Sequence, residues 1–338
     1  MIGRVAICHI CTRLTRSASS VVGSLLMYVG VTANTSVNVI PSSARKKKVA
    51  AGLQIRMFHV GEGECVLLVF PNKDAWLLEC GRTTGKKKNE KLADDMIDYL
   101  EKNKLFLKVI IPSHPHTDHA RAITRLISVK TNSIENPVTI YRSNDQGWKN
   151  KKSVWLKPFR KVVSLFANEI VIKNNQKKIV KIADDVFAHL FAAGGKTRPN
   201  YRSLFVQLRY HDAKILFTGD AYKRYETAML KKFGDASFVA DVLKITHHGS
   251  KGGTDKDVLA KIQPGIATAS TAKHKSHDLD PKTRATIENQ SDKIRIFETA
   301  RTNSGKLRAR DIVINTDGKS IAGSGILYHA RRLTSKFK

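Results

Sequence analysis

Residues Ser113 to His119 read SHPHTDH, which places three histidines and one aspartate within seven positions. The preceding run, Phe106–Ile111, is apolar except for Lys108 and does not alternate, which predicts a strand covered on both faces. Folding alone does not require imidazoles at such a place, because histidine is neither a good core residue nor a special surface one. Four potential ligands directly after a buried strand therefore predict a metal site.

Two further strands end in side chains of the same kind. Lys214–Thr218 leads to Asp220, and Val239–Thr246 leads to His247 and His248. In open α/β sheets, sites lie beyond the carboxyl ends of strands, so we expect these residues to meet the SHPHTDH loop. Imidazole nitrogens and carboxylate oxygens suit Zn, Mn or Fe.

The spacing of the loop allows its side chains to face two ways. We expect His114 and His116 to point at one metal and Asp118 and His119 at a second, with Asp220 as a bridge. Two ions about 3.5–4 Å apart clamp the attacking hydroxide and the leaving oxygen of a displacement. The predicted cofactors are therefore two divalent metal ions, Zn or Mn. A closed structural zinc site is disfavoured, because such sites usually contain cysteines.

The charge of the chain is far from neutral. Lys and Arg number 59 against 29 Asp and Glu, a formal net charge of +30 over 338 residues. Such a surplus favours polyanionic partners. Residues 142–181 carry much of it, and within them Val154–Phe166 suits a helix, with Trp148 and Trp155 nearby. Mixed basic and aromatic residues suit a nucleic-acid surface. The predicted contacts are Lys149, Lys151, Lys152, Lys157, Arg160 and Lys161.

The ends of the chain differ from its middle. Residues 1–50 contain no acid and resemble a targeting peptide or a disordered segment, although a wrongly chosen start codon is also open. The apolar stretch Val21–Ala33 is too short to indicate a transmembrane domain. We expect one domain over 51–325, with a basic insert at about 142–181 and a basic tail at 326–338. A cytoplasmic location is favoured, with export or organelle targeting left open.

Two cysteines flank a predicted hairpin turn. Cys65 and Cys80 would lie opposite one another if the register is symmetric about Pro71–Asp74. Two buried free thiols are the default expectation, and a cross-strand disulfide is the alternative.

Taken together, the motifs resemble those of a known superfamily. They read FHVGEGE, LLECG, SHPHTDH, NYRSL, LFTGD and LKITHHGS, in that order, across roughly residues 53–300. This order is similar to the metallo-β-lactamase fold superfamily, and most like the hydrolase domain of the ComEC competence-protein family. The resemblance implies an α/β fold, an αββα sandwich with a dinuclear metal site at one edge.

The resemblance also implies roles for single residues. His114, His116, Asp118, His119 and Asp220 would bind the metals. One of His247 and His248 would serve as ligand or general acid, so both stand with Asp118 as catalytic candidates. His277 would complete the second metal, with His274 as the competing choice. Glu79, Asn200 and Ser203 would support the ligands from behind.

Three departures from the family pattern stand out. No histidine in the expected pattern separates SHPHTDH from Asp220, although ComEC-like relatives carry an asparagine where Asn200 lies. Glu79 replaces the usual strand-end aspartate. Ala120-Arg121-Ala122 replaces a glycine-rich turn and puts an arginine near the mouth of the site.

These observations predict a metal-dependent phosphodiesterase or nuclease acting on nucleic acid, with DNA favoured by analogy to the family. The first alternative is hydrolysis of a small anionic substrate such as a cyclic nucleotide, lactone or thioester. The second is a non-catalytic nucleic-acid-binding protein with a degenerate metal site.

Overall fold

The computed structural model describes residues 52–83, 85–192, 194, 202–272, 278–290, 294–300, 309–323 and 326–329. All of these residues belong to one compact unit. Asn200, His274 and His277 lie outside the described residues, so their predicted roles stay predictions.

Within the described residues, the first sheet has nine strands in the order β16-β15-β14-β1-β2-β3-β4-β5-β6. One end of this sheet is parallel, because β3, β4, β5 and β6 run in the same direction, and the remaining strands pair antiparallel. The strands are β1 Leu53–Met57, β2 Gly63–Val69, β3 Asp74–Arg82, β4 Phe106–Ile111, β5 Ile134–Ser143, β6 Ala167–Ile172, β14 Ile312–Thr316, β15 Ser320–Gly323 and β16 Ile326–His329.

The second sheet has seven strands in the described part of the chain, in the order β13-β12-β11-β10-β9-β8-β7. The strands β10 to β13 run parallel, and β7 to β9 continue the sheet as an antiparallel meander. The strands are β7 Lys177–Ala183, β8 Val186–Ala192, β9 Leu204–Tyr210, β10 Ala213–Phe217, β11 Val242–Lys244, β12 Ile266–Ala269 and β13 Arg295–Glu298.

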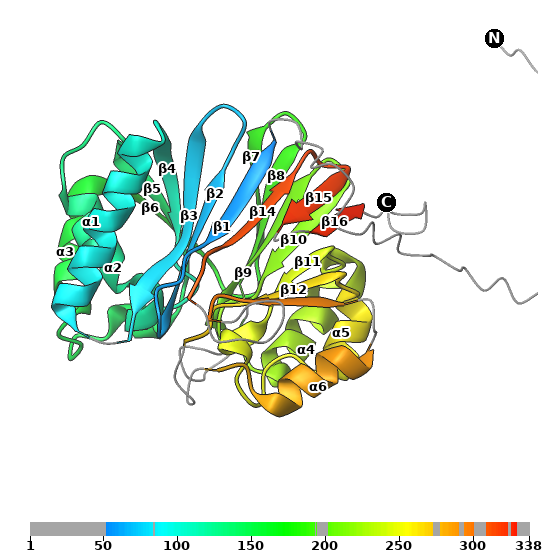
Figure 1. The fold of residues 1–338 in the computed structure, drawn as a ribbon. Coiled ribbons are helices and arrows are strands. Elements are labelled where there is room, and N and C mark those ends of the chain that lie inside the picture. Colours follow the sequence, from blue (N-terminus) through cyan, green and yellow to red (C-terminus); the bar gives the residue numbers. More distant parts are fainter. Residues whose placement is uncertain are drawn as a thin grey trace, which may run out of the picture. The chain divides into compact units, whose positions relative to one another are not determined.

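Helices cover part of the outer face of each sheet (Figure 1). The first sheet carries α1 Lys86–Lys102, α2 Thr117–Ser128 and α3 Leu156–Phe166. The second carries α4 Lys223–Phe233, α5 Lys256–Ile262 and α6 Pro281–Gln290. Alternate strand residues meet between the sheets, where they form a third apolar core. The predicted αββα sandwich is confirmed.

Two segments given their own boundaries in the sequence analysis take part in the sheets. Residues 142–181, after α3, supply β6 and most of β7, which are edge strands of the two sheets. Their burial is irregular, so the sequence showed no clear alternation there. The sheet also continues past residue 325, since β16 pairs with β15 and places Tyr328 opposite Ile321.

The described helices include none that is both long enough and apolar enough to span a membrane.

Candidate metal centre

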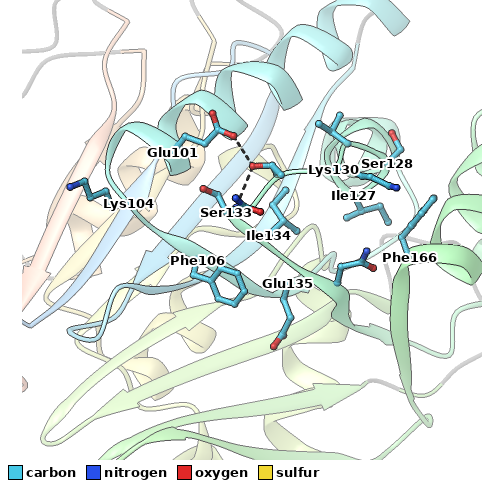
Figure 2. A pocket seen from close by; sticks show the side chains of 14 residues that line it. Glu101, Lys104, Phe106, Ile127, Ser128, Lys130, Ser133, Ile134, Glu135 and Phe166 are labelled. Atoms are coloured by element: carbon cyan, nitrogen blue, oxygen red, sulfur yellow. Dashed lines mark hydrogen bonds between the residues drawn. The ribbon is translucent and has the colours of Figure 1, made fainter.

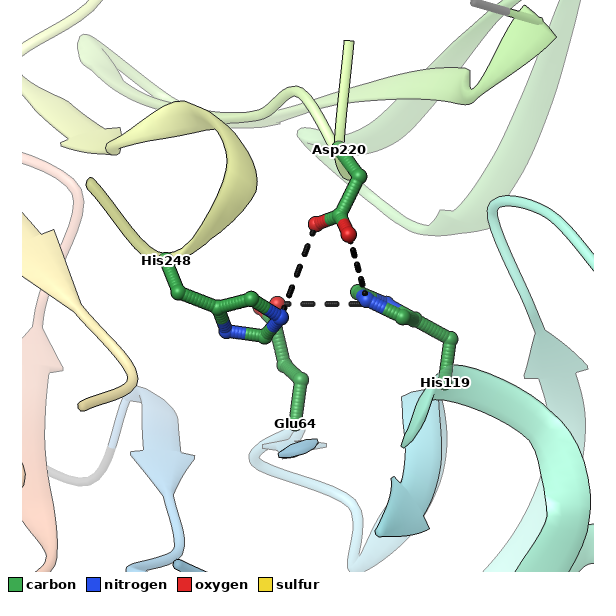
Figure 3. A group of neighbouring side chains, drawn as sticks. All are labelled: Glu64, His119, Asp220 and His248. Carbon is green, nitrogen blue, oxygen red and sulfur yellow. Dashed lines mark ion pairs between the residues drawn. The ribbon is translucent and has the colours of Figure 1, made fainter. Parts of the chain in front are cut away.

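Four buried side chains converge at the edge of the sandwich: Glu64, His119, Asp220 and His248 (Figure 3). Each offers one ligand atom, and these atoms all lie within 4.8 Å of one another. They come from four separate elements, namely β2, the first turn of α2, the turn after β10, and the 3₁₀ turn Thr246–Gly249 that follows β11. The strand ends predicted from the sequence therefore do meet.

The loop that carries His119 lies directly on β3. Gly81 makes this possible, because a Cβ atom at Gly81 would come within 2.2 Å of the carbonyl oxygen of Thr117 and 2.8 Å of the backbone nitrogen of His119. The Nε2 atom of His119 lies 3.0 Å from Oδ2 of Asp220. On the other side of the ring, Nδ1 lies 3.4 Å from Oε2 of Glu79.

Glu79 also fixes the start of the loop, because its Oε2 accepts the backbone N–H of Ser113 at 3.0 Å. A carboxylate that orients a ligating histidine is a common arrangement behind metal ions. The substitution of aspartate by glutamate at this position therefore leaves a carboxylate in reach of the loop.

Asp220 sits on a tight turn whose backbone approaches two serines. Gly219 has φ +56°, and a Cβ atom there would meet the side chains of Ser113 and Ser203 at under 3 Å. The backbone N–H of Asp220 donates to Oγ of Ser203 at 3.0 Å, and that oxygen lies 3.5 Å from Nδ1 of His114. Ser203 thus touches both predicted ligands.

His247 and His248 both adopt left-handed backbone conformations, with φ of 50° and 55°. Such values are costly for residues other than glycine and are typical of functional sites. Nδ1 of His248 lies 3.1 Å from the carbonyl oxygen of Ser270. If that nitrogen donates, Nε2 is left with its lone pair toward Asp118 and Asp220, at 3.6 and 3.7 Å. Of the two histidines, the geometry favours His248 as a ligand.

His114 and His116 lie next to this group. Nε2 of His114 is 3.8 Å from Oδ2 of Asp220, and the rings of His114 and His116 lie 4.5 Å apart. His116 is the N-cap residue of α2 and is only half-buried. The structure therefore brings together all predicted ligands that lie in its described part.

Lys244 is a member of the site that the sequence analysis missed. Its Nζ lies 2.5 Å from Oε2 of Glu64, 3.9 Å from Oδ1 of Asp220, and 3.2 Å from the carbonyl oxygen of Gly219. The side chain is 1% exposed. Burial opposes its charge, but the carboxylates of Glu64 and Asp220 outweigh burial and raise the pKa of Lys244. Glu64 lies in the FHVGEGE motif but was not predicted as a ligand. The signal for Lys244 in the sequence is a lysine inside the apolar run VLKI.

The charges of the centre stabilise one another. Burial opposes ionisation of Asp220, but His119 and His248 outweigh it and hold the pKa of Asp220 well below its usual value. For Asp118, too, His119 and His248 outweigh burial and lower the pKa. For His119, burial is outweighed by Asp220 and Glu79, which raise its pKa well above the usual value. For His114, burial dominates and lowers the pKa.

The donor set fits a divalent cation. Nε2 of His114, His119 and His248 and Oδ1 of Asp220 are all buried, and none has a hydrogen-bond partner among the described residues. Buried polar atoms are normally paired, so unpaired nitrogens and an oxygen aimed at one another are what a metal ion would satisfy.

A family model of the metallo-β-lactamase superfamily matches residues 60–274. The chain belongs to this superfamily. Its hydrolases normally use divalent metal ions, and the group around Asp220 is the candidate metal site of this member.

Among curated proteins, this metallo-β-lactamase superfamily member is similar to Recombination protein 2 of Haemophilus influenzae, with 24% identity over 231 residues. It is also similar to ComE operon protein 3 of Bacillus subtilis, with 30% identity over 115 residues. These matches cover 65% and 34% of this chain but only 24% and 14% of the relatives. The ComEC resemblance of the motifs is thus confirmed at low identity, over a small part of each relative.

Two solved structures are also similar. YhfI from Bacillus subtilis has a TM-score of 0.47 and 13% identity, covering 72% of this chain and 96% of YhfI. The short form of human tRNase Z has a TM-score of 0.41 and 16% identity, covering 77% of this chain and 98% of that one.

A large open pocket lies elsewhere, between the end of α1, the start of β4 and the start of β5 (Figure 2). Its volume is about 1010 Å³, and Glu101, Phe106 and Glu135 are among its lining residues. Because the metal centre follows the carboxyl end of β4, this pocket at the amino end belongs to the opposite edge of the sheet.

Proposed function

We propose that this protein hydrolyses phosphodiester bonds in nucleic acid, with DNA as the favoured substrate. The observation that carries the proposal is that the candidate metal centre and the basic segment 142–181 start from the same edge of one sheet. The strands β4 and β5 are parallel, so the loops that follow Ile111 and Ser143 leave the sheet side by side.

The charge of Asp145 links the start of the segment to the site. Burial lowers the pKa of His116, and the carboxylates of Asp118, Asp220 and Asp145 act against burial. Asp145 also pairs with Arg202 at 3.8 Å, next to Ser203 of the metal centre. The basic segment therefore begins beside the site.

The basic residues of the segment divide into two groups. Five of the predicted nucleic-acid contacts are exposed lysines, namely Lys149, Lys151, Lys152, Lys157 and Lys161. Arg160 is instead held by the loop, because Nη1 donates to the carbonyl oxygens of Trp148 and Asn150. Trp148 is buried against Phe159, so it does not offer a face to a base. Val154, 88% exposed, and the half-buried Trp155 are the apolar groups beside the lysines.

The site residues suit hydrolysis of a phosphate ester. His119, Asp220 and His248, with His114, His116 and Asp118 beside them, would hold a divalent cation, which would act there as a Lewis acid and lower the pKa of a water molecule. Asp118 is ionised at neutral pH and more exposed than Asp220, so it accepts a hydrogen bond from the attacking water. Burial lowers the pKa of His247, so its neutral ring donates a hydrogen bond to a phosphate oxygen. The exposed lysines bind the backbone on either side.

The test is cleavage of labelled single- and double-stranded DNA and RNA in Mn²⁺, Zn²⁺ or EDTA, together with the metal content of the purified protein. We expect metal-dependent cleavage that falls about 100-fold or more in Asp118→Asn, with binding retained. Asp184→Asn, an exposed aspartate paired with Lys181 in the β7–β8 turn, is the matched control and should cleave normally.

Two results would contradict the proposal. Bound metal with cleavage of small phosphodiesters but of no polymer would favour the small-substrate alternative. Binding of nucleic acid without metal and without cleavage would favour a non-catalytic protein.

A further inference from the structure

A second cluster of basic side chains lies on the outer face of the seven-stranded sheet. It is carried by β7, β8 and β9, whose ribbons Figure 1 labels. Alternate residues of β8 and β9 enter the core between the sheets, including Ala188, Leu190 and Leu208. Their neighbours His189 and Arg209 therefore face outward. On β7, Val180 and Ile182 pack against the same core, which turns Lys177 outward as well.

The register brings these three side chains into one area. His189 lies opposite Gln207, and Arg209 is two residues further along the same face of β9. Lys177 lies opposite Phe191, with its Nζ 5.4 Å from the centre of that ring. The His189 ring is 6.3 Å from the same phenyl group. Lys177, His189 and Arg209 thus form a diagonal row across three neighbouring strands.

No carboxylate balances this row within the described part of the chain. Neither Lys177 nor Arg209 forms an ion pair there, and the polar partner of Arg209 is the neutral Gln207, whose Oε1 accepts from Nε at 2.8 Å. Among the described residues, neither Nη atom of Arg209 has an acceptor, so both are available to a ligand. Lys181, on the same face of β7, differs, because it pairs with Asp184 at 2.9 Å.

The centre of the row contains an unpaired polar atom. His189 is only 7% exposed, and its Nδ1 has no hydrogen-bond partner among the described residues. A buried donor or acceptor without a partner is costly, and most such groups are satisfied by a ligand, an ion or a water molecule.

The charge state of His189 favours a donor role. Burial, together with Arg209 and Lys177, lowers the pKa of His189 to about 3. At neutral pH the imidazole is therefore uncharged and carries one N–H, which can donate to an oxyanion without adding a third positive charge.

We propose that Lys177, His189 and Arg209 bind a phosphate group on the outer face of the seven-stranded sheet. The planar guanidinium matches two phosphate oxygens, the ammonium adds a point charge, and the imidazole donates one hydrogen bond. This site is separate from the metal centre and does not depend on the proposed hydrolytic activity. Free phosphate and a phosphate within a polynucleotide share this chemistry.

The test follows the side-chain ¹H–¹⁵N signals of His189 in the full chain, at pH 7 and constant ionic strength, during titration with inorganic phosphate. The signals are assigned by their loss in His189→Phe. We expect saturable shifts in the wild type, and an affinity weakened about tenfold or more in Arg209→Gln and in Lys177→Gln. Lys181→Gln is the matched control on the same strand face and should bind as the wild type does.

Absence of a saturable shift at His189, or unchanged affinity in Arg209→Gln, would overturn the proposal. Lys177 and Arg209 are partly or fully exposed, so their variants test the site even if His189→Phe does not fold. A DNA oligonucleotide without terminal phosphates then identifies the source. Displacement of phosphate from His189 assigns the site to a polynucleotide backbone, and no displacement assigns it to free phosphate.

Discussion

Lys244 and the row formed by Lys177, His189 and Arg209 show two opposite ways to place positive charge in one molecule. Lys244 is completely buried, yet carboxylates surround it and raise its pKa. Lys177 is exposed, yet it lies near Arg209 without any described carboxylate, and burial together with Arg209 lowers its pKa. The local density of opposite charge, and not exposure or the net charge of +30, decides which cations hold the fold and which are available to a ligand.

The largest predicted effect is that of Lys244→Met in the metal-free protein. Removing one partner of a buried ion pair leaves Glu64 buried without its cation, so we expect a loss of about 3–5 kcal/mol in the free energy of unfolding, measured with urea. Lys181→Met, which removes an exposed lysine, should change stability little. The double variant Glu64→Gln, Lys244→Met should recover part of the loss. Equal stability of Lys244→Met and wild type would show that the pair is not structural.

Glu226 extends the comparison to a buried acid whose hydrogen-bond partners are neutral. It accepts hydrogen bonds from Thr246 and Thr254 behind the His247–His248 turn, but burial raises its pKa from 4.5 to about 7. The folded state therefore binds this proton more tightly than the unfolded state. The stability it contributes is fully present below pH 4.5 and is lost as the pH rises through about 7.

Glu226→Gln removes that dependence while keeping an acceptor oxygen. Its stability relative to the wild type should rise between pH 4.5 and 7 by up to about 3 kcal/mol, at about 1.4 kcal/mol per pKa unit, and then level off. Urea unfolding at several pH values measures the difference. A difference that does not change with pH would contradict a raised pKa.

We expect the exposed lysines after β5 to bind the phosphate groups of DNA. In the triple variant Lys149→Gln, Lys151→Gln, Lys152→Gln, the slope of log affinity for DNA against log salt should fall by about 1 for each lost phosphate contact. Filter binding or fluorescence anisotropy from about 50 to 200 mM salt measures it. The control replaces Lys102, Lys104 and Lys130, which are exposed at the opposite edge of the sheet. Equal slopes in both triple variants would mean that the surplus charge acts diffusely.

The smallest expected effect concerns Lys177. Because it repels Arg209 and has no described ion-pair partner, Lys177→Gln should unfold at the same or slightly higher denaturant concentration, by at most about 0.5 kcal/mol. A clear loss of stability would indicate that Lys177 is a structural cation like Lys244.

The predictable part of the site consists of residues that directly follow a predicted apolar strand. His114, His116, Asp118 and His119 follow one such strand, and Asp220 and His248 follow two others. The resemblance to the superfamily also gave the sandwich, which the two sheets confirm.

Residues joined only by the packing of the sheets were not predictable in the same way. The pairing of Glu64 with Lys244 joins β2 of one sheet to β11 of the other, and no local pattern encodes that contact. The edge strands β6 and β7 were missed because exposed residues occur on both of their faces. Trp148 and Arg160 looked like ligand-binding residues from composition, whereas one is buried and the other is bonded to backbone carbonyls.

Gly81 has a consequence for protein engineering. The SHPHTDH loop fits against β3 only because residue 81 lacks a side chain, and Glu79, two positions earlier on that strand, anchors the loop by its first N–H group. Copying the seven-residue motif onto another strand–helix junction would therefore transfer the imidazoles without the surface that orients them. A working transplant would need a host strand with a carboxylate and a glycine two residues apart, alongside the strand that carries the motif.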